Sequence, residues 1–74
     1  MKRPEDYFTA RLIEDVEDAL CYGSRVSVVC KDIPAISGYV VDATRSSFTI
    51  EKNGKLQRVR MCDVLLFDFL DRST

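Results

Sequence analysis

The chain has 74 residues, a formal net charge of −1 at neutral pH, 46% apolar residues and 31% charged residues. This balance is that of an ordinary globular domain and excludes a disordered or low-complexity segment. The longest stretch without a charged side chain, residues 33–41, is too short to cross a membrane. The N-terminus turns acidic at Glu5 and Asp6, unlike a secretory signal. We expect one domain over residues 1–74, with no membrane contact.

Residue types that are central to catalysis and metal binding are scarce. The chain has no histidine, so no Ser-His-Asp or Cys-His catalytic arrangement is possible. Its cysteines, Cys21, Cys30 and Cys62, form no C-x-x-C pair and are too few for a structural zinc site. No glycine-rich nucleotide motif is present. We expect a protein that is not an enzyme and has no cofactor, metal or small-molecule substrate. Its three free thiols are expected to pack as small apolar side chains in a reducing cytoplasm.

The first predicted element is a helix over residues 4–22. Pro4 suits the first helical turn, where its missing N–H costs no hydrogen bond, and Gly23 is typical of the residue that ends a helix. Apolar residues at three- and four-residue spacing predict one buried stripe across an open end of the strands: Phe8, Leu12, Val16, Ala19 and Leu20. The acidic residues are expected to lie in water: Glu14, Asp15, Glu17 and Asp18.

Beyond Gly23 the apolar period changes to two, which predicts five short strands. The expected strands cover residues 25–30, 35–43, 47–52, 55–61 and 64–70. Gly38, inside the second strand, indicates a sharp bend or a close backbone approach. Asn53 and Gly54 are a strong hairpin signal. The last strand is apolar enough to be covered on both faces. One helix and five bent antiparallel strands in a meander predict a mostly β fold, a small open barrel of the SH3-like or Sm-like type.

Charged residues are unevenly distributed along the chain. Residues 1–23 carry a net charge of −3, residues 24–62 carry +4, and residues 63–74 carry −2. A positive excess over the strands is compatible with a surface that contacts phosphates, although it is smaller than in dedicated basic domains. An ordinary solvated surface is the alternative interpretation.

The order of one helix and five short strands, with a glycine inside the second strand, resembles the Sm-like family, which includes the Hfq proteins. The resemblance covers residues 4–70. In the first family motif a glycine precedes alternating apolar positions, an acidic residue and a short turn. Residues 36–50 match it with Gly38 and with the apolar positions Val40, Ala43, Phe48 and Ile50. The family's conserved aspartate falls on Thr44, and its asparagine falls near Ser47.

The second family motif is an arginine followed by a glycine and an asparagine, between apolar residues. Residues 59–64 read Val-Arg-Met-Cys-Asp-Val, which keeps the arginine as Arg60. Met61 stands in place of the glycine, and Asp63 in place of the asparagine. The Tyr-Lys-His run that Hfq proteins carry here is absent.

The resemblance implies a ring of about five to seven identical subunits, in which the fourth strand of one subunit pairs with the fifth strand of the next. An uncovered last strand, with only Asp68 as a charged residue, would be an aggregation hazard that such pairing removes. A ring would also repeat a small basic patch in every subunit, so that weak contacts gain by avidity.

The resemblance further implies that the ring binds single-stranded RNA through two turns that line its pore. The implied RNA-binding residues are Arg45, Ser46, Ser47, Arg60, Met61 and Asp63. Arg60 would contact a phosphate or a base edge. Ser47 and Asp63 would form hydrogen bonds with base edges, and Arg45 or Met61 would pack on base faces.

Purely structural roles remain as alternatives for these residues. Arg60 could instead form a salt bridge with Asp63 or Asp42, and Ser46 and Ser47 are common turn residues. The missing motif residues and the acidic helix favour a second function class. In this class the chain is a non-enzymatic protein-interaction module with the same barrel, which has lost RNA binding.

Overall fold

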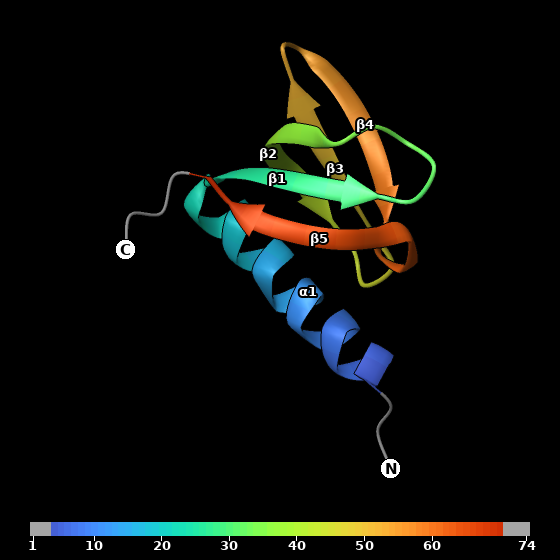
Figure 1. Cartoon of the computed structure of the whole chain (residues 1–74). Coiled ribbons are helices and arrows are strands. Elements are labelled where there is room, and N and C mark those ends of the chain that lie inside the picture. The colour runs from blue at the N-terminus through green and yellow to red at the C-terminus, as the bar shows by residue number, and fades with distance from the viewer. Residues whose placement is uncertain (1–3, 71–74) are drawn as a thin grey trace.

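The computed structural model describes the backbone of residues 4–70 and the side chains of residues 10–70, as one α-helix followed by five strands (Figure 1). The elements are α1 (Pro4–Tyr22), β1 (Arg25–Cys30), β2 (Ile36–Ala43), β3 (Ser47–Lys52), β4 (Lys55–Arg60), the 3-10 helix η1 (Met61–Asp63) and β5 (Val64–Phe69). Every predicted element is present, and the predicted bounds differ from the observed ones by one residue at most.

The five strands form one antiparallel sheet in the order β4-β3-β2-β1-β5. The predicted meander is confirmed for β1 to β4, but β5 does not pair with β4. Instead η1 carries the chain across the sheet, and β5 pairs with β1, from Cys30 opposite Val64 to Val26 opposite Phe69. The bent sheet stays open, so β4 and β5 are its two edges (Figure 1). The predicted fold class, a small open barrel of five bent strands, is confirmed.

The strong bend of the sheet depends on two features of β2. The register of β2 against β3 shifts between Val40 and Asp42, so that β2 carries one extra residue there. Gly38 lies where the backbones of β2 and β3 approach closely. A Cβ atom at this position would overlap the backbone carbonyl of Glu51 and lie 2.9 Å from Ile50 Cγ2. The close backbone approach that the glycine predicts is therefore present.

Two turns adopt the left-handed backbone that their residues favour. Gly23 ends α1 with φ 64°, and the N–H of Ser24 donates to the carbonyl of Ala19 at 3.1 Å, which closes a Schellman motif. Asn53 and Gly54 have φ values of 54° and 80° in the hairpin turn between β3 and β4. The predicted helix end and hairpin are confirmed.

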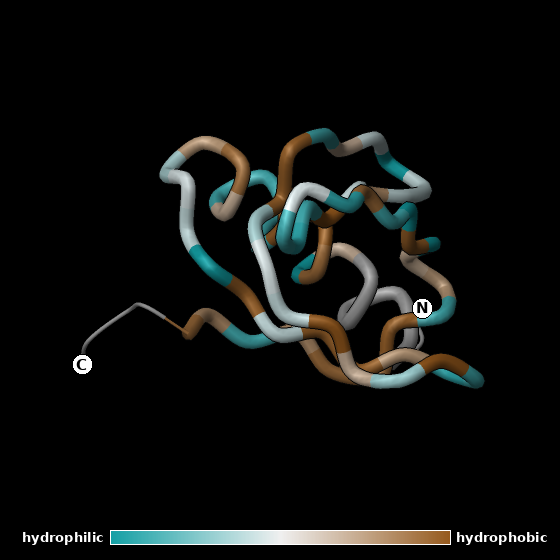
Figure 2. The backbone as a smooth tube through the Cα atoms, turned by 90° about the horizontal axis from the view of Figure 1, so that it is seen from above, coloured by the Kyte–Doolittle hydropathy of each residue, from teal (hydrophilic) through white to brown (hydrophobic). Residues whose placement is uncertain are grey.

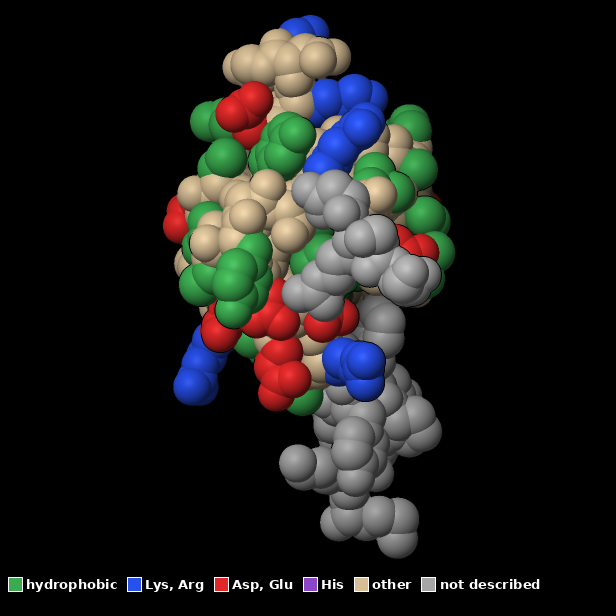
Figure 3. Space-filling view, turned by 90° about the vertical axis from the view of Figure 1, so that its left-hand side faces the viewer, with side chains coloured by type: hydrophobic (Ala, Val, Ile, Leu, Met, Phe, Trp, Pro, Cys, Tyr) green, Lys and Arg blue, Asp and Glu red, His purple; other side chains and the backbone are tan. Residues whose placement is uncertain are grey.

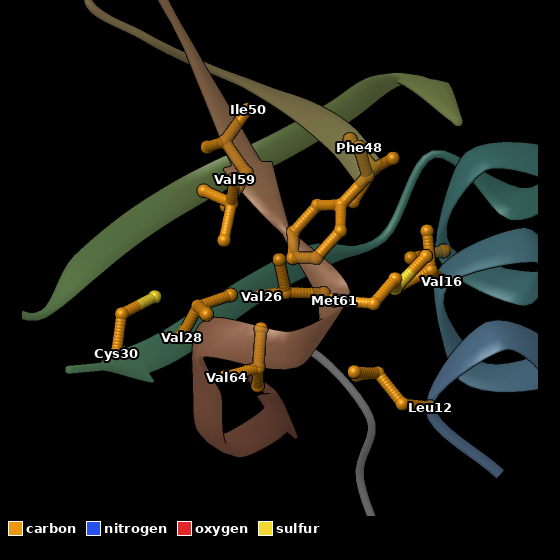
Figure 4. Packing of buried hydrophobic residues seen from close by; sticks show 12 residues of the cluster. Leu12, Val16, Val26, Val28, Cys30, Phe48, Ile50, Val59, Met61 and Val64 are labelled. Carbon is orange, nitrogen blue, oxygen red and sulfur yellow. The ribbon is translucent and has the colours of Figure 1, made fainter. Parts of the chain in front are cut away.

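The hydrophobic core lies between the inner face of the bent sheet and one side of α1 (Figure 4). Its buried side chains are Leu12, Val16, Ala19, Val26, Val28, Cys30, Val40, Phe48, Ile50, Val59, Met61 and Val64. Phe48 packs edge-to-face on Phe67 of β5, with ring centroids 5.9 Å apart. Hydrophobic and hydrophilic residues alternate along much of the strands, so one face of the sheet packs and the other meets water (Figure 2).

The buried stripe of α1 is narrower than predicted. Leu12, Val16 and Ala19 are buried, but Leu20 is 38% exposed because it lies on the opposite flank of the stripe from Leu12 and Ala19. Phe8 lies outside the described side chains. Glu14, Glu17 and Asp18 are exposed as predicted, whereas Asp15 is half-buried. In the described part of the chain, no helix has the length and apolar content needed to cross a membrane.

The three cysteines are free thiols in different surroundings. Cys30 is buried, and burial raises its thiol pKa, with a further upward contribution from the Asp63 carboxylate. Cys21 and Cys62 are exposed, so the prediction that all three pack as apolar side chains is wrong for these two. Among the described residues, no three histidine, cysteine, aspartate or glutamate side chains are grouped so that they could hold a metal ion.

Candidate functional site

The turn between β2 and β3 lies beside the η1 turn because β3 and β4 are paired. Ser47, the first residue of β3, is opposite Arg60, the last residue of β4. The backbone N–H of Met61 donates to the carbonyl of Ser46 at 2.9 Å. The structure thus brings together, at one end of the β3–β4 ladder, the two segments that the sequence motifs single out.

Thr44 organises the first of these turns. Its hydroxyl oxygen accepts hydrogen bonds from the backbone N–H groups of Ser46 at 3.2 Å and Ser47 at 3.1 Å. Its own N–H donates to the carbonyl of Ser47 at 2.7 Å. A threonine at the position of the family's aspartate therefore still supplies a side-chain acceptor for the turn. In the motif comparison, Thr44 differs from the family's aspartate and received no role. Its position two residues before Ser46 and three before Ser47 is nevertheless typical of a hydroxyl that holds a turn.

The two serines take part in this turn and also face solvent. Ser46 is exposed and Ser47 is half-buried. The hydroxyl oxygens of Ser46 and Ser47 lie 3.5 Å and 3.3 Å from that of Thr44. The turn role that was the alternative interpretation of both serines is therefore present. It leaves hydroxyl groups at the surface, where they could also meet a ligand.

Arg60 and Asp63 form a salt bridge across η1. Arg60 Nε donates to Asp63 Oδ2 at 3.3 Å, and the two side chains are 71% and 37% exposed. The alternative role foreseen for Arg60 is thus observed, with Asp63 and not with Asp42. A pair this exposed contributes only about 0–1 kcal/mol to stability. Exchange of the carboxylate for a phosphate group would therefore cost the fold little.

Met61 does not belong to the exposed site. Its side chain is 4% exposed and points into the core, toward Leu12 and Val16 of α1 (Figure 4). The expectation that Met61 packs on base faces is wrong, because η1 turns this side chain inward. Strand alternation was the available signal, since Met61 lies two residues after the buried Val59. Met61 instead anchors the turn that carries Arg60.

Acidic side chains form a cluster on one part of the surface. On the face drawn in Figure 3, most Asp and Glu side chains gather toward the helix, with Lys and Arg side chains on either side of them, and further Lys and Arg side chains lie toward the opposite end. α1 exposes Glu14, Glu17 and Asp18, whereas the β3–β4 hairpin exposes Lys52 and Lys55. This basic hairpin lies at the opposite end of the β3–β4 ladder from Ser47, Arg60 and the two turns.

A pocket of about 630 Å³ lies away from the two turns, beside the start of β4. Pro34 and Ile36 line one side of it, and Lys55, Leu56 and Gln57 of β4 line the other. No residue of the Thr44–Ser47 turn or of η1 lines this pocket. The hollow borders an edge of the sheet, where a further strand could lie beside it.

No protein-family model matches the sequence, and no curated protein sequence matches it. A comparison with solved structures finds a crystal structure of Hfq, described as a pleiotropic translational regulator. The two chains share 11% identity with a TM-score of 0.70, and the match covers 95% of this chain and 100% of the Hfq chain. Identity this low establishes the fold alone. The chain has the Sm-like fold that the sequence of one helix and five short strands, together with the motifs, predicted.

Proposed function

We propose that this chain with the Sm-like fold assembles into a ring of identical subunits and binds single-stranded RNA without catalysing a reaction. The observation that carries the proposal is the contact between the two turns, with Ser47 opposite Arg60 and the Met61 N–H on the Ser46 carbonyl. In the proposed ring these turns would line the pore, as the resemblance to the Sm-like family implies. Each subunit would therefore add the same small polar site to a shared pore.

The two sheet edges support the ring. β4 exposes Leu56 at 68%, and β5 exposes Leu65 at 55%, Leu66 at 51% and the following Leu70 at 48%. Open edges with apolar side chains need a partner in a protein that stays soluble. The prediction that both faces of the last strand are covered is not met within one chain. Pairing of β4 with β5 of the next subunit would cover these side chains by a head-to-tail contact, which closes into a ring of about five to seven subunits.

The roles of the site residues follow from their exposure and charge. Arg60, and Arg45 at the tip of the β2–β3 turn, are exposed and would contact phosphates. Hydroxyls of Ser46 and Ser47 and the carboxylate of Asp63 would form hydrogen bonds with base edges. The contact of a single subunit is weak because the whole chain carries a net charge of −1. Repetition around a ring multiplies the positive charge at the pore and adds avidity.

Binding of labelled oligo(U) and oligo(A) at two salt concentrations tests the proposal, together with the molar mass from light scattering. We expect an oligomer that binds RNA with an affinity that falls as salt rises, because phosphate contacts release counterions. A monomer would remove the shared pore. An oligomer that binds neither oligonucleotide at low salt would contradict the RNA-binding role.

A second candidate function is a protein-interaction module that does not bind RNA. The observation that favours it is the Arg60–Asp63 salt bridge, which already occupies the arginine within the subunit. The exposed acidic side chains of α1 also favour this second function. This candidate predicts an oligomer with no measurable affinity for either oligonucleotide, so the same binding experiment separates the two functions.

A further inference from the structure

Arg60 and Asp63 place hydrogen-bond groups of opposite kinds side by side at the surface of η1. Arg60 Nε donates to Asp63 Oδ2 at 3.3 Å, so the guanidinium lies next to this oxygen. The other carboxylate oxygen, Oδ1, accepts a long hydrogen bond from the Cys62 thiol at 3.8 Å. The pair therefore presents an N–H donor, then Oδ2, then Oδ1, and both oxygens are acceptors.

The salt bridge leaves hydrogen-bond capacity on both side chains. A guanidinium has several N–H donors, of which Nε supplies one, and each carboxylate oxygen accepts more than one hydrogen bond. The Arg60 and Asp63 side chains are 71% and 37% exposed, so a ligand can reach both. A thiol is only a weak donor, so Cys62 leaves Oδ1 able to accept a stronger hydrogen bond.

The backbone that carries this pair is held on both sides of η1. The Met61 N–H donates to the carbonyl of Ser46, and the Lys31 N–H donates to the carbonyl of Asp63, each at 2.9 Å. Between these two contacts the Met61 side chain is buried. The order of donor and acceptors is thus fixed before a ligand arrives, which lowers the cost of binding one.

Guanine is the base whose pairing edge carries the complementary order of groups. Along this edge O6 accepts, and N1–H and the N2 amino group donate, so O6 matches the guanidinium and the two donors match Oδ2 and Oδ1. Adenine and cytosine each offer one ring acceptor beside one amino donor, and so complete two of these three contacts. Uracil also completes two, but it then places its O2 acceptor opposite Oδ1, and two facing acceptors repel each other.

We propose that Asp63, held by Arg60, selects guanine at the candidate site, with O6 on the Arg60 guanidinium and the two donors of the base on the carboxylate. This inference rests on the RNA binding proposed above and names the nucleotide that the site takes. The preference depends on the carboxylate. An asparagine at this position would present one acceptor and one amino donor, and the amino donor would face a donor of guanine.

Short oligo(U) probes that differ only at one central nucleotide test the preference, and a single guanosine avoids guanine-quadruplex formation. The wild type should bind the guanosine probe at least about fivefold more tightly than the all-uridine probe, the scale of one well-matched base contact. The adenosine and cytidine probes should lie between them. Inosine keeps O6, N7 and N1–H but lacks the N2 amino group, so its probe should lose most of the advantage. Equal binding of guanosine and inosine would overturn the contact of the amino group with Asp63.

A matched pair of variants separates the contact from a change in net charge. Asp63→Asn should bind the guanosine and inosine probes equally. Asp68→Asn removes the same charge at an exposed position of β5 and should keep the wild-type ratio between these probes. Circular dichroism checks that each variant is folded, and the wild-type probe series decides the base preference by itself if Asp63→Asn does not fold.

The outcomes distinguish the base preference from RNA binding itself. A wild type that binds all probes equally, or prefers uridine, would overturn the preference for guanine and leave the RNA-binding role intact. A folded Asp63→Asn variant that keeps the wild-type ratio would also overturn the role of Asp63, as would an Asp68→Asn variant that loses this ratio. A wild type that binds no probe at low salt would overturn RNA binding, and the preference with it.

Discussion

The two turns of the candidate site lie side by side but are held in different ways. The β2–β3 turn depends on hydrogen bonds to Thr44, whose hydroxyl accepts from two backbone N–H groups. The η1 turn depends on burial, because Met61 packs beneath α1 while Arg60 and Asp63 face solvent above it. One turn is thus stabilised within its own few residues, and the other by the core. Changes that disturb each turn should therefore differ in size.

The largest effect is expected for Met61→Ala. Removal of this buried side chain loses apolar contacts and leaves a cavity beneath η1, so the free energy of unfolding should fall by about 2–5 kcal/mol. Urea unfolding followed by circular dichroism measures the change. Met61→Leu, which keeps most of the volume, should cost less than about 1.5 kcal/mol. A loss below about 0.5 kcal/mol for Met61→Ala would be that of a surface position and would contradict the buried anchor.

A smaller effect is expected at Thr44. Thr44→Ala removes the acceptor of two backbone N–H groups in an exposed turn, and the free energy of unfolding should fall by about 1 kcal/mol. Thr44→Ser keeps the hydroxyl and should retain most of the stability. Thermal unfolding of the three proteins provides the comparison. Equal losses for the alanine and serine variants would show that the hydroxyl does not hold the turn.

Arg60→Ala should hardly change stability, because its salt bridge is exposed, yet it should weaken RNA binding. Loss of one phosphate contact per subunit lowers the affinity and flattens its dependence on salt. Arg45→Ala should act in the same direction. The control is Lys55→Ala at the far end of β4, which removes the same charge away from the turns. If the wild type binds RNA and both arginine variants keep its affinity and salt slope, the two turns are not the binding site.

Thiol labelling tests the surroundings of the three cysteines without any substitution, so it perturbs the protein least. The exposed Cys21 and Cys62 should react readily with a thiol reagent, whereas Cys30 should react at least about tenfold more slowly. Burial and the nearby Asp63 carboxylate raise the pKa of Cys30 and disfavour its thiolate. The reaction of Cys30 in the folded protein should therefore begin at a higher pH than in the unfolded chain. Mass spectrometry of the labelled protein counts the modified sites, and equal rates at all three would contradict the burial of Cys30.

The raised pKa of Cys30 also determines how its contribution to the free energy of unfolding changes with pH. Below the unfolded pKa the thiol is neutral in both states, and its contribution is fully present. It is lost as the pH rises through the higher folded pKa, because the unfolded state releases its proton first. A Cys30→Ser comparison under alkaline conditions should show this loss in the wild type alone.

The prediction that all five bent strands form a meander is wrong at one place, because β5 pairs with β1 and not with β4. The η1 turn that makes this crossing also carries part of the candidate site. The hydrophobic pattern located β5 within one residue but did not show that it pairs with β1. A strand's partner depends on where the bent sheet and the helix leave space, which no short stretch of residues specifies. The family motif likewise placed Met61 on the exposed surface, whereas its burial depends on α1, some forty residues earlier in the chain.

Elements that depend on neighbouring residues were thus predictable from the amino-acid order. The spacing of apolar residues predicted α1 and the strands, Gly23 predicted the helix end, and Asn53 with Gly54 predicted the hairpin. The contact between the two turns, the salt bridge across η1 and the open edges of β4 and β5 were decided in three dimensions. The physical reason is the separation along the chain over which each kind of interaction acts. Backbone preference and side-chain period act over a few residues, whereas strand order and burial follow from packing among segments that lie far apart along the chain.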